Sequence, residues 1–225
     1  MARVIVFDVN ETLLDLRAFD PWFEATFGGP GVRTQWFGQL LQSALVSTVT
    51  DAYADFGAIG RAALDMVAAR HGRQLDDAER QALSSTMRNL PAHPEVVPAL
   101  ERLRDAGLRL ATLTNSTEQV ATAQLTNAGI AGYFERILSA DAVRRLKPAR
   151  EPYDMAAREL GVPIGGIQLV AAHAWDVAGA LRAGASAAFV SRPGMVLDPL
   201  APVPDIIGDD LAAVADRILD VEGSR

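Results

Sequence analysis

Blocks of apolar residues separated by polar turns run along most of the chain and predict alternating strands and helices. Residues 4–8 open the chain with β-branched and aromatic side chains, which is typical of a buried strand. Further strands are predicted at residues 108–113, 133–138, 167–172, 187–190 and 206–207. Helices are predicted at residues 118–128, 151–160 and 175–183, and a last helix is expected to be capped by Asp209 or Asp210. This alternation favours an α/β fold, with a parallel sheet covered by helices on both faces.

Residues 15–91 interrupt this rhythm, because they contain no convincing strand. Their apolar side chains recur at helical spacing in two stripes, Leu40, Leu41, Ala44, Leu45 and Thr48, and Ile59, Ala62, Ala63, Met66 and Val67. A proline-rich segment at residues 90–94 ends the stretch. We therefore predict a Rossmann-like, doubly wound parallel-sheet core of residues 1–14 and 93–225, and an all-helical cap of residues 15–92 inserted after the first strand. The cap is placed to close over the end of that strand, although its helices would also fit an extension of the core.

The composition is that of a globular protein, with 225 residues of which 49% are hydrophobic and 22% charged. A net charge of -7 argues against a nucleic-acid partner, and no apolar run is long enough to cross a membrane. The N-terminus lacks the pattern of a signal peptide, so we expect a cytoplasmic protein. The absence of cysteine excludes thiolate chemistry, and having only three histidines argues against a His-rich zinc site. The apolar stripes of the cap also fit a homodimer interface.

Polar side chains recur where the predicted strands end. They are Asp8, Thr12, Thr114, Asn115, Lys147 and Asp176. Because ligands of open α/β sheets bind outside the carboxyl ends of the strands, we expect these side chains to converge. A carboxylate at the end of an apolar strand needs a partner, and one role for Asp8 is nucleophilic attack that forms a covalent ester. Taken singly, each residue would also suit a helix cap, a turn or the surface, but their order along the chain favours a shared site.

With these residues the chain resembles the haloacid dehalogenase superfamily of hydrolases, and more narrowly its type II (S)-2-haloacid dehalogenases. The matching segments are residues 7–15, 113–116, 146–148 and 173–180, together with residues 53–56 in the insert. The resemblance implies that Asp8 attacks C2 of a small halogenated carboxylic acid, expels halide and forms an aspartyl ester. Water then hydrolyses that ester to a 2-hydroxy acid. The resemblance implies neither a cofactor nor a metal.

The resemblance also implies roles for the other residues of the site. Lys147 keeps Asp8 ionised, because a nearby cation lowers the pKa of a carboxylate. Thr12 orients the nucleophile, and Asp176 holds Lys147 and helps to position the water. The residues expected to orient or line the substrate are Asn10, Phe37, Tyr53, Phe56, Thr114, Asn115, Tyr153 and Trp175.

The residue type at the position of Asn10 distinguishes two reactions of this superfamily. The phosphatases carry a second Asp at this position, which protonates the leaving alcohol, and they use Mg²⁺ to neutralise phosphate charge. The type II dehalogenases usually have an aromatic residue there. Asn does not donate a proton as an acid does, and a halide needs none, so Asn10 favours carbon–halogen chemistry. A Mg²⁺-dependent phosphatase of small metabolites and a non-catalytic binder of small acids are the two alternatives.

Three further positions depart from the type II pattern. That branch has an arginine directly after a tryptophan in the cap, where this chain has Phe37 after Trp36. Arg33 is close in sequence but lies about one helical turn away. The last motif of the branch has Ser and Asn where this chain has Ala171 and His173. We therefore expect His173 to serve as the base that activates water near neutral pH, or as a donor to the halide.

Overall fold

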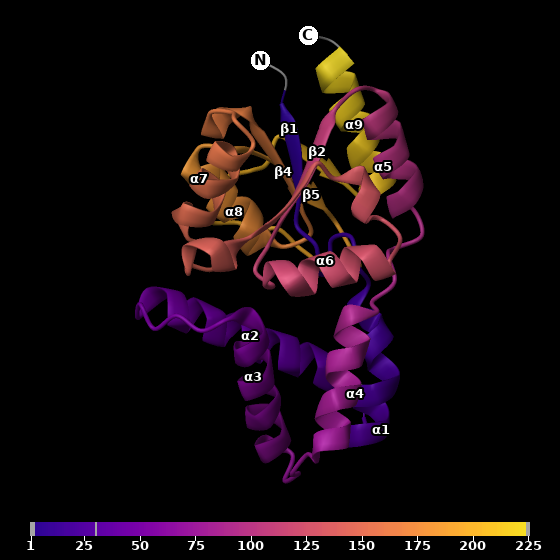
Figure 1. The fold of residues 1–225 in the computed structure, drawn as a ribbon, viewed down its shortest axis with the longest axis vertical. Coiled ribbons are helices and arrows are strands. Elements are labelled where there is room, and N and C mark those ends of the chain that lie inside the picture. Colours follow the sequence, from indigo (N-terminus) through magenta and orange to yellow (C-terminus); the bar gives the residue numbers. More distant parts are fainter. Residues whose placement is uncertain (1–2, 30, 224–225) are drawn as a thin grey trace.

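The computed structural model describes residues 3–29 and 31–223, and its centre is a six-stranded parallel sheet (Figure 1). The strands are β1 (Val4–Phe7), β2 (Arg109–Thr114), β3 (Arg136–Ser139), β4 (Ile167–Ala171), β5 (Ser186–Val190) and β6 (Ile206–Gly208). Their order in the sheet is β3-β2-β1-β4-β5-β6, and every neighbouring pair is parallel. The chain thus builds one half of the sheet outward from β1 and the other half outward from β4. This order confirms the doubly wound fold and puts its topological switch point between β1 and β4.

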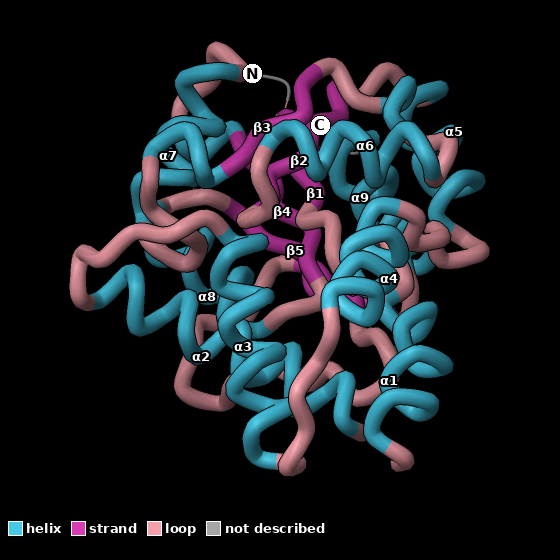
Figure 2. Tube along the Cα trace, turned by 60° about the horizontal axis from the view of Figure 1, so that its bottom comes forward, coloured by secondary structure: helices cyan, strands magenta, loops and turns pink. Residues whose placement is uncertain are grey.

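Helices cover both faces of this sheet, and Figure 2 shows the strands enclosed between them. The helices around the sheet are α5 (Val96–Asp105), α6 (Glu118–Asn127), α7 (Arg150–Glu159), α8 (Ala174–Ala183) and α9 (Leu211–Gly223). Ile5 and Phe7 belong to the core that contains the buried side chains of α5 and α9, whereas Val4 and Val6 belong to the core under α7 and α8. Successive residues of a strand point to opposite faces, so β1 has to be apolar throughout to serve both cores.

The predicted strands and helices of the sheet region are all present, close to their predicted bounds. The strand expected at residues 133–138 begins only at Arg136, because Ala131–Tyr133 forms a 3₁₀ turn, η2. Asp210 caps the last helix, where its Oδ1 accepts a hydrogen bond from the Ala213 N–H (2.8 Å). The sequence predictions omit α5, although its buried side chains follow helical spacing closely enough to have been recognised.

Between β1 and α5 the described chain forms helices and loops. The helices are the 3₁₀ helix η1 (Leu16–Phe19), α1 (Asp20–Phe27), α2 (Val32–Val49), α3 (Phe56–Arg70) and α4 (Asp77–Arg88). Figure 1 shows β1 running toward them, so they lie beyond the carboxyl end of that strand. The two segments that connect these helices to the sheet lie side by side. The Asp15 N–H donates to Pro91 O (2.8 Å), and the His93 N–H donates to Leu13 O (3.0 Å).

Helices α2 and α3 pack closely against each other. Trp36 Nε1 donates to Gly60 O (2.9 Å), and a Cβ on Gly60 would already lie 3.2 Å from Leu40 Cδ1. The predicted apolar stripes are only partly buried, because Leu45 and Met66 are each 43% exposed. The outer members of each stripe therefore lie on the surface rather than in the core.

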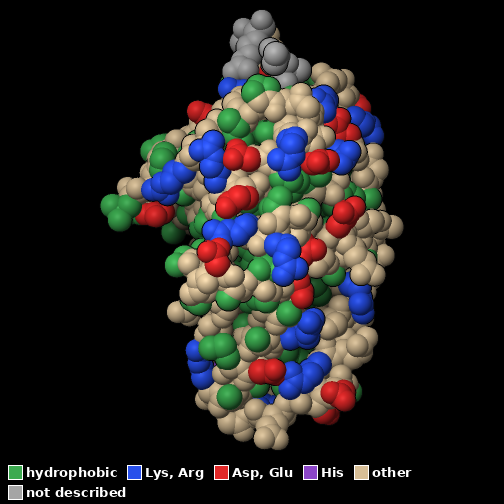
Figure 3. All heavy atoms as spheres, turned by 60° about the vertical axis from the view of Figure 1, so that its left-hand side comes forward, with side chains coloured by type: hydrophobic (Ala, Val, Ile, Leu, Met, Phe, Trp, Pro, Cys, Tyr) green, Lys and Arg blue, Asp and Glu red, His purple; other side chains and the backbone are tan. Residues whose placement is uncertain are grey.

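The surface carries charges of both signs. On the face that Figure 3 shows, acidic and basic side chains are interspersed, and the described side chains form no continuous basic patch there. None of the helices formed by residues 3–29 and 31–223 combines the length and the apolar character needed to cross a membrane.

Candidate active site

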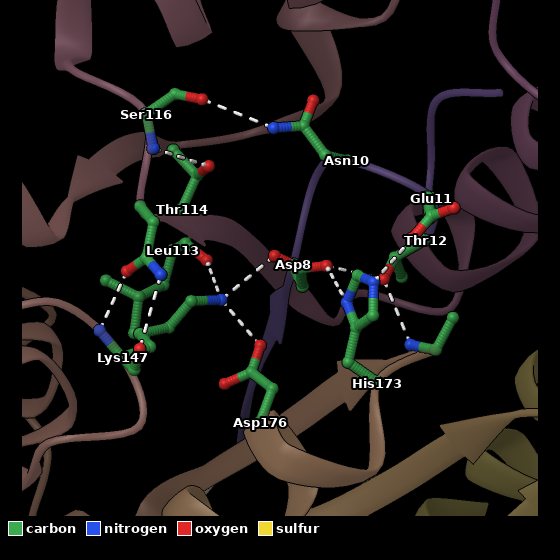
Figure 4. A network of polar contacts seen from close by, with 12 residues as sticks. Asp8, Asn10, Glu11, Thr12, Leu113, Thr114, Ser116, Lys147, His173 and Asp176 are labelled. Carbon is green, nitrogen blue, oxygen red and sulfur yellow. Dashed lines mark hydrogen bonds and ion pairs between the residues drawn. The ribbon is translucent and has the colours of Figure 1, made fainter. Parts of the chain in front are cut away.

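Asp8 follows β1 directly and lies at the centre of a buried polar network (Figure 4). Its backbone N–H donates to Val170 O (3.0 Å), which continues the β1–β4 ladder by one residue and aims the side chain beyond the sheet. Lys147 Nζ donates to Asp8 Oδ1 (2.9 Å), and Thr12 Oγ1 donates to Asp8 Oδ2 (2.7 Å). Burial raises the pKa of Asp8, but Lys147, His173 and Thr12 together outweigh burial and hold that pKa well below its ordinary value. The carboxylate is therefore ionised and oriented.

Lys147 is buried, and the network satisfies all three of its ammonium donors. Besides Asp8, Nζ donates to Asp176 Oδ2 (2.5 Å) and to Leu113 O (2.8 Å). Burial lowers the pKa of Lys147, but the two carboxylates raise it, and the net effect is an increase. Asn115 holds the backbone in place, because its Oδ1 accepts from the Lys147 N–H (2.7 Å) and its Nδ2 donates to Lys147 O (3.3 Å). The lysine thus remains a fixed cation beside Asp8.

Asp176 lies in the first turn of α8 and is completely buried. The Tyr153 hydroxyl donates to its Oδ1 (2.6 Å), while Lys147 occupies its Oδ2. Burial and the charge of Asp8 raise the pKa of Asp176 in spite of Lys147. Tyr153 and α8 can approach this closely because residue 179 is glycine, where a Cβ would lie 2.6 Å from the Tyr153 hydroxyl oxygen. Tyr153 therefore orients Asp176 rather than meeting Asp8 directly.

Two threonines predicted for the site have different partners. Thr12 Oγ1 accepts from the Ala172 N–H (3.0 Å) while it donates to Asp8, so it joins the loops that follow β1 and β4. Thr114 Oγ1 accepts from the Ser116 N–H (3.2 Å) and closes its own loop. Thr12 thus positions the Asp8 carboxylate, whereas Thr114 shapes the neighbouring loop.

His173 lies at the other side of Asp8 and is buried. Its Nδ1 is 3.3 Å from Asp8 Oδ2, and its Nε2 donates to Glu11 Oε2 (2.9 Å). Glu11 Oε1 is in turn 3.7 Å from Arg33 Nη1. Burial lowers the pKa of His173, but Asp8 and Glu11 raise it to about 9. With Asp8 ionised, the two carboxylates favour the imidazolium form of His173 near pH 7, and its role as water-activating base or halide donor stays a prediction from the sequence.

Aromatic rings flank His173 on the side of the helical insert. The Trp175 ring stacks on it with 5.1 Å between centroids, and the Phe37 ring lies 6.0 Å away. Lys147 Nζ is 5.9 Å from the Trp175 centroid. A cavity of about 10 Å³ remains beside Trp175 and Lys147; its other lining residues are Leu41, Ala44, Leu45 and Asn115. Helix α2 therefore closes this side of the site.

Three predicted residues lie apart from Asp8. Tyr53 donates to Asp141 and carries the Arg144 guanidinium over its ring, which ties it to the loop after β3. Phe56 lines a different cavity of about 190 Å³ between α2, α3, α4 and the start of α6. Asn10 Nδ2 donates to Ser116 Oγ (3.2 Å), so its amide points toward α6. Their described contacts do not include the Asp8 carboxylate.

The sequence interpretation missed the partner of His173. Glu11 lies within the motif of residues 7–15 and is a charged residue at a backbone φ of +61°, a conformation that favours glycine. Arg33 contacts Glu11 and, through Nε, Asp20 (2.6 Å). It therefore does not take the place of an arginine at residue 37 beside Asp8.

Comparisons with known proteins agree with this geometry. A model of the haloacid dehalogenase-like hydrolase family matches residues 2–184. The chain is 27% identical over 218 residues to (S)-2-haloacid dehalogenase H-109 of Pseudomonas putida, covering 96% of this chain and 97% of the relative. It is 29% identical over 205 residues to haloacetate dehalogenase H-2 of Moraxella sp. (strain B), covering 90% and 92%. The structure of L-2-haloacid dehalogenase from Xanthobacter autotrophicus with chloropropionic acid covalently bound superimposes with a TM-score of 0.90 at 25% identity, covering 97% and 98%.

Proposed function

The chain belongs to the haloacid dehalogenase-like hydrolases, and from this we propose that it cleaves the carbon–halogen bond of small 2-haloacids. Asp8 attacks C2, the bond from C2 to the halogen breaks, and the halide leaves with the electron pair. Water then attacks the carbonyl carbon of the resulting aspartyl ester and releases a 2-hydroxy acid. The names of the relatives and the covalently bound chloropropionic acid in the Xanthobacter autotrophicus enzyme support this reaction.

The observation that carries the proposal is the state of the Asp8 carboxylate. It is buried, ionised, and held at one oxygen by Lys147 and at the other by Thr12. A carboxylate kept ionised in apolar surroundings is a better nucleophile than one shielded by water, because no hydration shell has to be removed. The fixed donors also orient it toward an incoming carbon atom.

Asp176 keeps the site electrically balanced during this reaction. Formation of the ester removes the charge of Asp8, and a buried lysine without a counterion would be costly. Asp176, 2.5 Å from Lys147 Nζ, remains as that counterion. Lys147 is then free to donate to the ester oxygen that becomes negative when water attacks.

His173 and the rings beside it support a small anionic substrate. No arginine contacts Asp8 in the described part of the chain, and the His173 ring lies 6.0 Å from the ring of Phe37, which occupies the position where the type II branch has its arginine. We infer that His173 and Lys147 attract the substrate carboxylate and the departing halide. Phe37 and Trp175 supply the apolar wall, which suits a short carbon chain and a halogen.

The helical insert is proposed to be a cap of residues 15–92 on a core of residues 1–14 and 93–225. The adjacent exit and return of the chain at Asp15 and His93 support this division. The cavity of about 10 Å³ beside Trp175 is about the size of one water molecule, so binding of a haloacid between Trp175 and α2 requires α2 to move away from the core. A cytoplasmic location and a homodimer stay predictions from the sequence.

Halide release tests the proposal directly. The purified chain is incubated without added metal with (S)-2-chloropropionate, chloroacetate or fluoroacetate, and free halide is measured by ion chromatography. We expect halide from at least one acid, and none from Asp8→Asn, which has nearly the same shape but a neutral amide. Absence of halide from all three acids would contradict the proposal.

The two alternatives give different results in the same preparation. A phosphatase would hydrolyse an aryl phosphate only after Mg²⁺ is added. A non-catalytic binder would be stabilised against heat by the acids without forming product, and Asp8→Asn would bind them equally well. Within residues 3–29 and 31–223, no group of three or more His, Cys, Asp or Glu side chains is arranged to hold a metal ion.

A further inference from the structure

Glu11 is held in a strained conformation between the nucleophile and Thr12. Its φ of +61° is sterically unfavourable for a residue with a Cβ, and such residues persist where the surroundings enforce them. Its own N–H donates to Leu14 O (2.9 Å), which closes the turn and fixes the direction of the side chain. A glycine would adopt this φ without strain, so the carboxylate itself is the feature that calls for a function.

The Glu11 carboxylate reaches the site through His173. Oε2 accepts from His173 Nε2 (2.9 Å), and Oε1 faces Arg33 Nη1 at 3.7 Å. Glu11 and Arg33 also line a cavity of about 330 Å³ on the outer side of this pair. Solvent and Arg33 therefore compensate the charge of Glu11, while His173 separates it from Asp8.

The second ring nitrogen of His173 points at the nucleophile. Nδ1 is buried, lies 3.3 Å from Asp8 Oδ2, and makes no well-directed hydrogen bond to any described residue. Because Glu11 holds a proton on Nε2, a neutral His173 has its lone pair on Nδ1, facing the Asp8 carboxyl. A carboxylate that orients a histidine in this way is the arrangement by which general bases are selected in hydrolases.

We propose that His173 is the general base of ester hydrolysis and that Glu11 is its positioning residue. This inference rests on the proposed function, since it concerns the second step of that reaction. His173 is catalytic because it takes a proton from the attacking water. Glu11 acts only through His173, by fixing its tautomer and the direction of Nδ1.

The charges change through the cycle in the way that this role requires. The free site holds His173 as an imidazolium against the Asp8 carboxylate. When Asp8 displaces halide and becomes an ester, that negative charge disappears, and His173 releases its Nδ1 proton to water. Water then adds to the ester carbonyl and gives its proton to Nδ1. The carbonyl–alkoxy bond breaks, the alkoxy oxygen takes the remaining proton of the added water, and the Asp8 carboxylate and the imidazolium are restored. One proton is released for each haloacid hydrolysed.

The charged groups around His173 determine the pH dependence of this step. Asp8 and Glu11 contact the ring directly, Lys147 and Asp176 lie behind Asp8, and Arg33 lies behind Glu11. Removing the Glu11 charge removes an interaction that favours the imidazolium. Ester hydrolysis in Glu11→Gln should therefore depend on pH with its midpoint moved to lower pH than in the parent chain.

Trapping of the ester tests the inference. The chain and its variants are mixed with (S)-2-chloropropionate, quenched with acid at intervals, and analysed for free chloride and for intact protein mass. For His173→Asn we expect one chloride per protein in a burst, followed by ester decay slowed by about 10²-fold. Glu11→Gln and Glu11→Gly should slow ester decay by at least about tenfold, because the base loses its orientation. Glu11→Gly removes the strain together with the carboxylate, so a folding defect does not explain its result.

The controls separate this inference from the proposed function. Glu24→Gln changes an exposed glutamate of α1 and should leave both chloride release and ester decay unchanged. If the parent chain turns over but the Glu11 and His173 variants decay at its rate, the inference is wrong and the proposed function stands. If the parent chain forms neither chloride nor ester, the proposed function fails first.

Discussion

Lys147 Nζ donates to Asp8 Oδ1 across 2.9 Å inside the protein, where their side chains are 0% and 6% exposed. Replacing Lys147 by methionine keeps the length of the side chain but leaves Asp8 and Asp176 as buried carboxylates without their shared cation. We expect a loss of about 3–5 kcal/mol in the free energy of unfolding, the cost typical of breaking a buried ion pair on one side. Urea unfolding near neutral pH measures it.

The double variant Lys147→Met with Asp176→Asn is the control for this prediction. It removes one of the two orphaned carboxylates, so it should be more stable than Lys147→Met alone. Equal stability of the two variants would mean that packing, not charge, accounts for the loss. Neither variant should release halide, since Asp8 then lacks the cation that keeps it ionised.

The charge of His173 should make the free energy of unfolding decrease as the pH becomes alkaline. The ordinary pKa of 6.5 is raised to about 9 in the folded chain by Asp8 and Glu11, which prevail over burial. Because the folded state binds this proton more tightly, the contribution is complete below the ordinary pKa and is lost as the pH rises through about 9. A shift of this size corresponds to about 3 kcal/mol at most.

Comparison with His173→Asn isolates that contribution, because both chains share every other titrating group. Urea unfolding of each chain is measured at several pH values from below 6.5 to above 9. We expect the parent chain to lose more stability than the variant over this window. Parallel curves would show that His173 is not charged in the folded state.

The place of a residue in the site could be predicted where it depends on the end of a strand. It could not be predicted where it depends on a contact between two loops that are far apart in the sequence. Asp8 could be assigned because an apolar strand ends on it, and Asp176 because β4 lies beside β1, so that their carboxyl ends meet. Lys147 lies in the loop beyond the end of β3, which β2 separates from β1, and its role beside Asp8 was implied by the resemblance to the family. The parallel sheet followed from the alternation of strands and helices, whereas the order of its strands is known only from the structure. The inferences on Asp8 and Asp176 need only the period of the side chains and the topology of the sheet.

Glu11 and His173 are 162 positions apart, and their contact depends on the turn after β1 adopting a positive φ. A pattern of apolar and polar residues contains no information about such a turn. Tyr53 and Phe56 lie apart from Asp8, because Tyr53 is held against Asp141 and Phe56 begins helix α3. Resemblance to a family supplied their expected roles, but it did not supply the path of the chain at residues 53–56.

Gly179 is predicted to tolerate no side chain. A Cβ there would lie 2.6 Å from both the Tyr153 hydroxyl oxygen and Pro148 Cβ. Gly179→Ala must push these groups away, with a loss of about 1–3 kcal/mol in stability, as overpacked cores show. Displacing Tyr153 also removes its hydrogen bond to Asp176, so the rate of halide release should fall together with the stability. Gly132→Ala is the matched control, because its Cβ meets no atom within 4 Å; equal unfolding midpoints for the two variants would contradict the prediction.

Variants of Thr12 test whether the orientation of the Asp8 carboxylate, and not only its charge, determines the rate at which halide is displaced. Its hydroxyl donates to Asp8 Oδ2 and accepts from the Ala172 N–H. Thr12→Val keeps the shape but leaves that N–H buried without an acceptor and Asp8 with one fewer donor, which should cost about 1–3 kcal/mol in stability. Thr12→Ser retains both hydrogen bonds, and its stability should stay close to that of the parent chain.

In rapid-quench measurements of the halide burst, we expect the burst of Thr12→Val to be slowed by about tenfold or more, since a freely rotating carboxylate rarely meets C2 in line. A normal burst in Thr12→Val, with Lys147 intact, would mean that the lysine alone orients the nucleophile.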